Sequence, residues 1–180
     1  MKPFIFIFLL CTISCAYDRT AVYNYAYKYW STPNHDCNSG YLECTPYIYL
    51  GGESCNYGTH GGDSANFVSQ CILAGGHDKF NKGICKGEYC GAEVDPKTLA
   101  VCLHDEFGWT STCGYNELPP EDIDVGDVLI YHKGSCNSSD ARAVIIVSKT
   151  GPTIACHSSN QWNKLYTYYG SGYLEWLHHP

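Results

Sequence analysis

The sequence predicts a single α+β domain, with helices in its first half and strands in its second. Three observations lead to this fold class. Apolar residues recur at helical spacing in three segments before residue 108, and short apolar runs between turn residues follow Pro119-Pro120. No internal repeat or linker divides the chain, and 180 residues that are 44% apolar are enough to bury one core.

The first helix is expected over residues 18–30, where apolar side chains recur every three or four positions. Asp18 can serve as its N-cap, and Pro33 ends it. The chain is rich in tyrosine from this helix onward, since nine of its 16 tyrosines lie between Tyr17 and Tyr57. Tyrosine rings that fill a loop-rich core are the preferred interpretation, and a carbohydrate- or peptide-binding surface is the alternative.

The second helix is expected over residues 64–74, with Asp63 as its N-cap and Gly75-Gly76 as its C-terminal stop. One side of this segment is apolar, so the helix should be central and buried. A third helix is expected over residues 96–107. Together these helices should pack on a small antiparallel sheet.

The strands of that sheet are expected where β-branched residues form short runs bounded by turn residues. Four segments meet this description: residues 128–131, 143–147, 153–156 and 173–177.

The first 16 residues have the features of a secretory signal peptide. A short positive segment precedes a ten-residue apolar run, Phe4–Ile13, and Ser14-Cys15-Ala16 supplies small residues for cleavage after Ala16. A lipid anchor on Cys15 is a weak alternative because Thr12 replaces the leucine that a lipobox prefers. The sequence therefore predicts a signal peptide at 1–16 and one secreted or extracytoplasmic domain at 17–180, with no membrane span because the apolar run is too short.

Twelve cysteines in 180 residues are typical of an oxidising compartment. Removing the signal leaves ten, which could form up to five disulfides of unknown connectivity. No CxxC pair suggests zinc, so neither a metal nor a cofactor is expected. The net charge of −7 argues against a nucleic-acid partner, and Asn137-Ser138-Ser139 is a glycosylation sequon. The expected disulfide residues are Cys37, Cys44, Cys55, Cys71, Cys85, Cys90, Cys102, Cys113, Cys136 and Cys156.

Ser64 stands at a position suited to nucleophilic chemistry. It opens the predicted buried helix after two glycines and an aspartate, where backbone N–H groups and the helix dipole favour negative charge. A cysteine there would be activated in part by the helix end alone. A serine hydroxyl stays protonated and needs a general base within hydrogen-bond reach.

Three segments resemble the putative amidase domain family, a branch of the papain-like, NlpC/P60-type cysteine hydrolases. They are Gly61–Gln70, Val125–Tyr131 and the strand start Ala141–Val144, and the resemblance extends over nearly all of residues 17–180. It implies a papain-like fold. It also implies a nucleophilic cysteine at a helix start, a general-base histidine at the start of a following strand, and a polar orienting residue on the next strand. The implied substrates are amide bonds, often in cell-wall peptides.

The family pattern fails at two of its three catalytic positions. Ser64 stands where the family has cysteine, and Arg142 is matched to the position of the histidine. Arginine is always protonated and cannot accept a proton from a hydroxyl. Only the third position keeps a suitable residue, with His157 as the best match and Asn160 in reserve. The resemblance thus implies an amidase-like domain without amidase activity.

The preferred hypothesis is a binding module for a peptide or a peptidoglycan fragment. The helix end at Asp63-Ser64, the cation of Arg142 and the nearby His157 could form an anion site, with His60 as a further contact. Internal pairing of Arg142 with Asp63 or Asp140 is equally compatible with the sequence.

Two further hypotheses remain open. The chain could be an active hydrolase in which Ser64 uses another histidine as its base: His157, His60, His104 or His132. It could also be a secreted, disulfide-stabilised scaffold. Asp127, in the turn before the first predicted strand, is interpreted as a turn residue.

Overall fold

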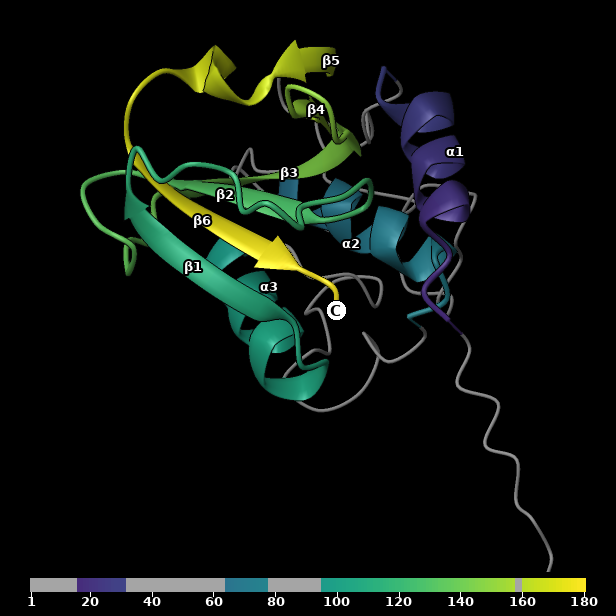
Figure 1. Cartoon of the computed structure of the whole chain (residues 1–180), viewed down its shortest axis with the longest axis horizontal. Helices are drawn as coiled ribbons and strands as arrows, with labels where there is room; N and C mark the ends of the chain where they lie inside the picture. The colour runs from purple at the N-terminus through teal and green to yellow at the C-terminus, as the bar shows by residue number, and fades with distance from the viewer. Residues whose placement is uncertain (1–15, 32–63, 78–94, 158–159) are drawn as a thin grey trace, which may run out of the picture.

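In the computed structural model, residues 16–31, 64–77, 95–157 and 160–180 can be described. They form an α+β fold with three helices and one six-stranded antiparallel sheet (Figure 1). The predicted signal peptide up to Cys15, together with Asp63 and His60, lies outside these residues. No helix in the described part is long and apolar enough to cross a membrane.

All three predicted helices are present. Helix α1 spans Arg19–Tyr29, and the side chain of Asp18 accepts a hydrogen bond from the N–H of Ala21 (2.9 Å), so Asp18 is the expected N-cap. Helix α2 spans Ser64–Ala74, as predicted. Helix α3 spans Pro96–Val101 and continues as a π-helical segment, η3, over Cys102–Glu106.

The sheet has the strand order β1-β6-β2-β3-β4-β5, with every neighbouring pair antiparallel. The four predicted strands correspond to its interior strands. The two that the sequence did not predict, β1 and β5, are the edge strands, whose side chains are mostly exposed or half-buried and so form no apolar run. The bounds are β1 Thr110–Tyr115, β2 Val128–His132, β3 Ala141–Ser148, β4 Thr153–Cys156, β5 Gln161–Leu165 and β6 Tyr173–His178.

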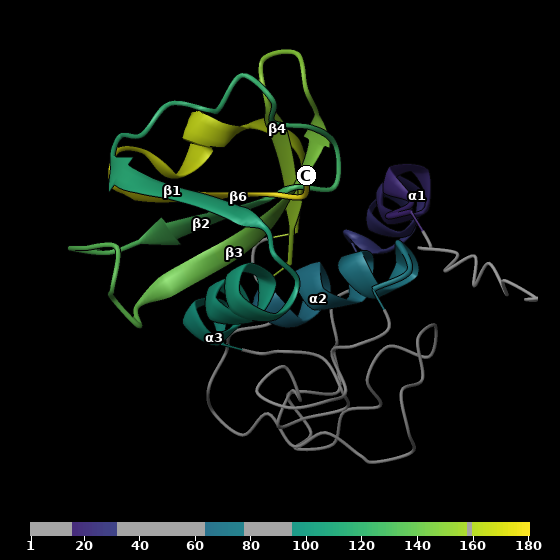
Figure 2. The same cartoon turned by 60° about the horizontal axis from the view of Figure 1, so that its bottom comes forward.

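The sheet separates two clusters of buried side chains. On one face, α1, α2 and α3 pack against alternate residues of β3, including Ala143, Ile145 and Val147. Figure 2 shows α2 and α3 against this helix-covered face. The opposite face buries the intervening residues Val144 and Ile146. This alternation follows from the two-residue repeat of a strand, and it decides which side chains of β3 can reach α2.

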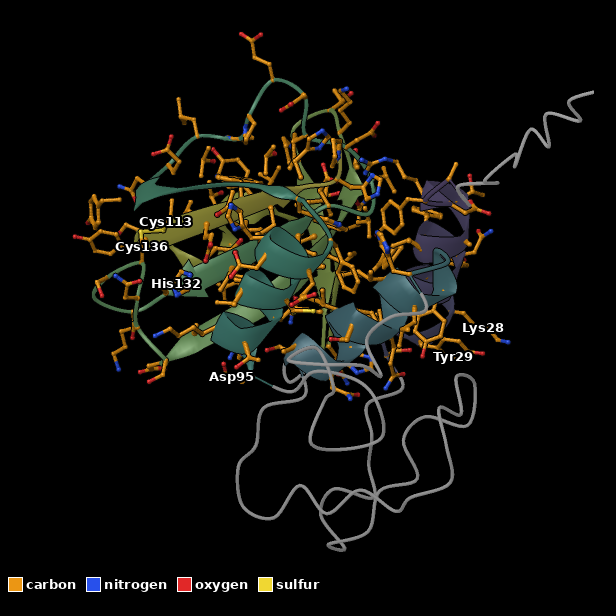
Figure 3. All side chains as sticks on the ribbon, turned by 90° about the horizontal axis from the view of Figure 1, so that it is seen from below. Lys28, Tyr29, Asp95, Cys113, His132 and Cys136 are labelled. Carbon is orange, nitrogen blue, oxygen red and sulfur yellow. A yellow bond between two sulfur atoms is a disulfide. The ribbon has the colours of Figure 1, made fainter. Side chains whose placement is uncertain are left out.

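The cysteines depart from complete pairing. Cys113 of β1 forms a disulfide with Cys136 in the β2–β3 connection (Figure 3). Cys102 is also disulfide-bonded. Cys71 and Cys156 are buried thiols, which corrects the expectation that both form disulfides. Because they belong to the clusters on opposite faces of the sheet, they are not placed to bond to each other. The remaining predicted disulfide residues, Cys37, Cys44, Cys55, Cys85 and Cys90, lie outside the described part.

Candidate functional site

Ser64 is the first residue of α2 and is 5% exposed. Its Oγ accepts a hydrogen bond from the backbone N–H of Ala143 on β3, at 3.3 Å. Among the residues that the structure describes, no histidine ring hydrogen-bonds to this oxygen. The helix start is therefore placed against the middle of the sheet, as a nucleophile position requires, but its hydroxyl is not connected to an imidazole base.

His157 lies beside the same helix. It directly follows β4, is 1% exposed, and stacks on the ring of Phe67 with 3.9 Å between ring centroids. Phe67 is about one helical turn after Ser64, so both project from the same side of α2. The Nε2 atom of His157 is 2.6 Å from the carbonyl oxygen of Tyr29 at the end of α1. Because a carbonyl only accepts, Nε2 carries a hydrogen in this contact.

Asn160, the reserve for the third family position, has a different environment. It is exposed and adopts a left-handed backbone conformation (φ 47°) just before β5. The structure thus brings His157, and not Asn160, to the buried side of α2.

Arg142 does not face Ser64, which corrects the predicted anion site. In the β2–β3 register, Arg142 lies opposite Tyr131 of β2. Its guanidinium lies 4.5 Å from the ring centroid of Tyr169. Tyr131 and Tyr169 pack on the face opposite the helices. Arg142 there lines an open pocket of about 280 Å³ that includes both tyrosines. The residues on either side of Arg142 point the other way because side chains alternate along a strand.

Alanines occupy the positions at the start of β3 that face the helices. Ala143 is fully buried in the helix-side core, and Ala141 packs against that core. At the start of β3, an imidazole could reach the α2 side only from one of these two positions. Arg142, which was matched to the family's histidine, lies between these two alanines on the opposite face of the strand.

Two other histidines considered as bases have their own partners. His104, in η3, is exposed and contacts the Asp105 carboxylate at 2.6 Å. His132, at the end of β2, is buried, and its Nε2 lies 2.8 Å from Glu175 of β6. Neither hydrogen-bonds to Ser64.

A buried polar network between α1 and α2 was not anticipated from the sequence. The Tyr25 hydroxyl donates to Gln70 Oε1 (2.5 Å), and Gln70 Nε2 donates to Asn66 Oδ1 (2.6 Å). Asn66 and Gln70 are four residues apart, so they lie on one side of α2. The sequence signal that could have predicted this network is the pair of amide side chains, four residues apart, within an otherwise apolar helix. The network holds the end of α1, which carries the Tyr29 carbonyl, against α2.

Asp127 was interpreted as a turn residue, and it has that role and a larger one. Its Oδ2 accepts from the N–H of Asp124 within the turn (2.6 Å). The carboxylate is fully buried, pairs with Arg19 at the start of α1 (2.7 Å) and lies 2.7 Å from Nδ1 of His178. It thus joins α1, the turn before β2 and the end of β6. Sequence reasoning missed these partners because they lie far apart along the chain.

Tyr17 packs beside this cluster, and its hydroxyl donates to the carbonyl of Gly126 (2.8 Å). Burial, with a smaller effect from the Asp127 charge, raises the pKa of Tyr17 well above its ordinary value. Within the described residues, no group of three or more histidine, cysteine or acidic side chains is arranged to hold a metal ion.

The fold and site define a class: an α+β domain in which the first residue of a buried helix is set against a central antiparallel strand, with a buried histidine on the next strand connection. Comparison with known proteins gives the family. The model of the family described as putative amidase domain matches residues 16–176, and the chain belongs to this family. No curated protein and no solved structure matches the chain.

Proposed function

We propose that this chain is a secreted, catalytically silent amidase-domain protein that binds a peptide or a peptidoglycan fragment beside the start of α2. The arrangement of Ser64 supports the proposal most directly, because its Oγ accepts a hydrogen bond from a backbone N–H and hydrogen-bonds to no described imidazole. A hydroxyl without a base is a poor nucleophile. The proposed ligand class is the one that the sequence resemblance implies, amide-linked cell-wall peptides.

The proposed ligand site uses Ser64 and His157, and it leaves Arg142 out. Ser64 supplies a hydroxyl at a helix end, and the stacking on Phe67 with the contact to Tyr29 fixes the ring of His157. Arg142 lies on the other face of the sheet.

We therefore expect Arg142→Ala to leave the affinity for an acidic peptide unchanged, as measured by calorimetric titration. A tenfold loss of this affinity would show that Arg142 belongs to the ligand site.

Restoring catalysis tests the silent site. Ser64→Cys combined with Ala141→His places a thiol at the helix end and an imidazole on the strand face that looks toward α2. We expect this double variant to gain hydrolysis of peptide amides or peptidoglycan over background. The matched control is Ser64→Cys with Arg142→His, whose imidazole points to the opposite face, and it should stay inactive.

The unchanged protein is assayed beside both variants, with circular dichroism to verify that they fold. Amide hydrolysis by the unchanged protein that is lost in Ser64→Ala would overturn the proposal and favour a serine hydrolase. Equal activity in the two double variants would show that the assignment of faces is wrong.

A further inference from the structure

The tyrosines of α1 are divided between two environments. Tyr25 and Tyr29 are buried in the helix-side core, as the core-filling interpretation predicted. Tyr23 and Tyr27 lie on the outer side of the same helix and are 37% and 60% exposed. The core therefore explains only part of the tyrosine enrichment, and the two outward rings need a separate explanation.

Trp162 of the edge strand β5 completes an aromatic surface with these two rings. The planes of Tyr23 and Tyr27 are parallel within 2°. Trp162 stands across both, at 66° to Tyr23 and 68° to Tyr27, with ring centroids 5.6 and 5.3 Å away. Figure 1 shows α1 beside the part of the sheet that holds β4 and β5. We call Tyr23, Tyr27 and Trp162 the α1–β5 aromatic surface.

Among the described residues of α1 and β5, this surface is mainly aromatic and polar. Leu165, the exposed leucine of β5, lies beyond a register shift between β4 and β5. It pairs with Thr153 and so lies on the same side of the sheet as Trp162, three residues further along the strand. The exposed polar residues next to the two tyrosines on α1 are Asn24 and Lys28. Ring faces bordered by hydrogen-bonding groups suit a ligand with apolar C–H faces and polar edges, which describes a pyranose sugar.

The size of the surface favours a sugar over a protein as its partner. An aromatic side chain buries about 150–250 Å² when fully covered, so three partly exposed rings offer on the order of 300 Å². A stable protein interface needs roughly 800 Å² on each partner. Apolar patches of a few hundred Å² on a monomer are often functional ligand surfaces.

We propose that the α1–β5 aromatic surface binds a glycan chain, whose sugar rings stack on Tyr23 and Tyr27 with Trp162 as a side wall. This binding is independent of the peptide site proposed beside Ser64, since it uses the outer side of α1. Sugar binding at this surface does not require Ser64 to be either active or silent.

Titration with soluble oligomers of β-linked N-acetylglucosamine tests the proposal, with calorimetry for affinity and tryptophan fluorescence for the environment of Trp162. We expect Tyr27→Ala to raise the Kd at least tenfold, which is about 1.4 kcal/mol. Tyr23→Ala should weaken binding too, and Tyr27→Phe should retain it, because stacking needs the ring and not the hydroxyl.

Tyr115→Ala is the matched control. Tyr115 is 63% exposed and lies on β1, the opposite edge of the sheet. Its removal should leave the Kd unchanged, and an equal loss in this control would overturn the site. Failure of the unchanged protein to bind any oligomer would also overturn it. Self-association that disappears in Tyr27→Ala would instead identify a second copy of the chain as the occupant.

Discussion

At the scale of single residues, the side to which a side chain points decides its role. Arg142 and Ala141 are neighbours in the sequence, yet one stacks on Tyr169 and the other packs on the core beneath the helices. A one-residue shift in matching a strand therefore moves a proposed base to the wrong face. For Ser64 the sequence position was sufficient, because the helix start itself places the hydroxyl.

Asp127 provides a stability prediction at this scale. Replacing it by asparagine removes a buried charge that is paired with Arg19 and contacts His178. Because Arg19 is partly exposed, we expect a loss of about 2–3 kcal/mol, somewhat below the usual cost of breaking a buried pair. The measurement is the urea midpoint at neutral pH.

The control for Asp127→Asn is Asp140→Asn. Asp140 pairs with Lys133 at 3.2 Å, but both side chains are largely exposed. Removal of this exposed pair should cost less than about 1 kcal/mol. If the two variants shift the urea midpoint equally, burial does not explain the contribution of Asp127 to stability.

At the scale of elements, the helices and interior strands were predictable from the sequence and the edge strands were not. Interior strands β2 and β3 are buried on both faces and appear as continuous apolar runs. Edge strand β1 contains polar and exposed residues, so its pairing with β6 depends on tertiary contacts. The disulfide Cys113–Cys136 then connects this edge strand to the β2–β3 connection.

Removing that disulfide should be costly because it closes a loop between residues 23 positions apart. Cys113→Ser with Cys136→Ser is expected to lower the free energy of unfolding by about 3 kcal/mol, through the freedom regained by the unfolded chain. Thermal or urea unfolding measures the change. The exposed loop variant Ser135→Ala should behave like the unchanged protein, and a double variant of undiminished stability would show that the link contributes little.

At the scale of the whole molecule, residues near both ends of the described domain meet around Asp127. The ring of His179 stacks on Tyr17 with centroids 4.6 Å apart, and its carbonyl accepts a hydrogen bond from Arg19 (2.8 Å). Burial, followed by the Arg19 charge, lowers the pKa of His179 below its usual value. Folding therefore disfavours protonation of this ring.

This pKa shift predicts the direction of a pH effect on stability. Below the usual histidine pKa of about 6.5, the unfolded chain binds a proton that the folded chain resists, so the stability falls as the pH drops through the folded pKa. We expect His179→Gln to reduce the difference in urea midpoint between about pH 7.5 and about pH 5. The exposed histidine variant His104→Gln should keep the full difference. An unchanged pH dependence in His179→Gln would contradict the assignment.

The α+β class, the three helices, the interior strands and the putative amidase domain family could be predicted from the sequence, because they depend on local periodicity, caps and contiguous motifs. The tertiary structure decided which face Arg142 and the alanines of β3 occupy, which thiols stay reduced, and which tyrosines remain outside the core. Each of these depends on contacts between residues distant in the chain. Such contacts are fixed by strand pairing and helix packing, and the residue pattern of a single segment does not predict them.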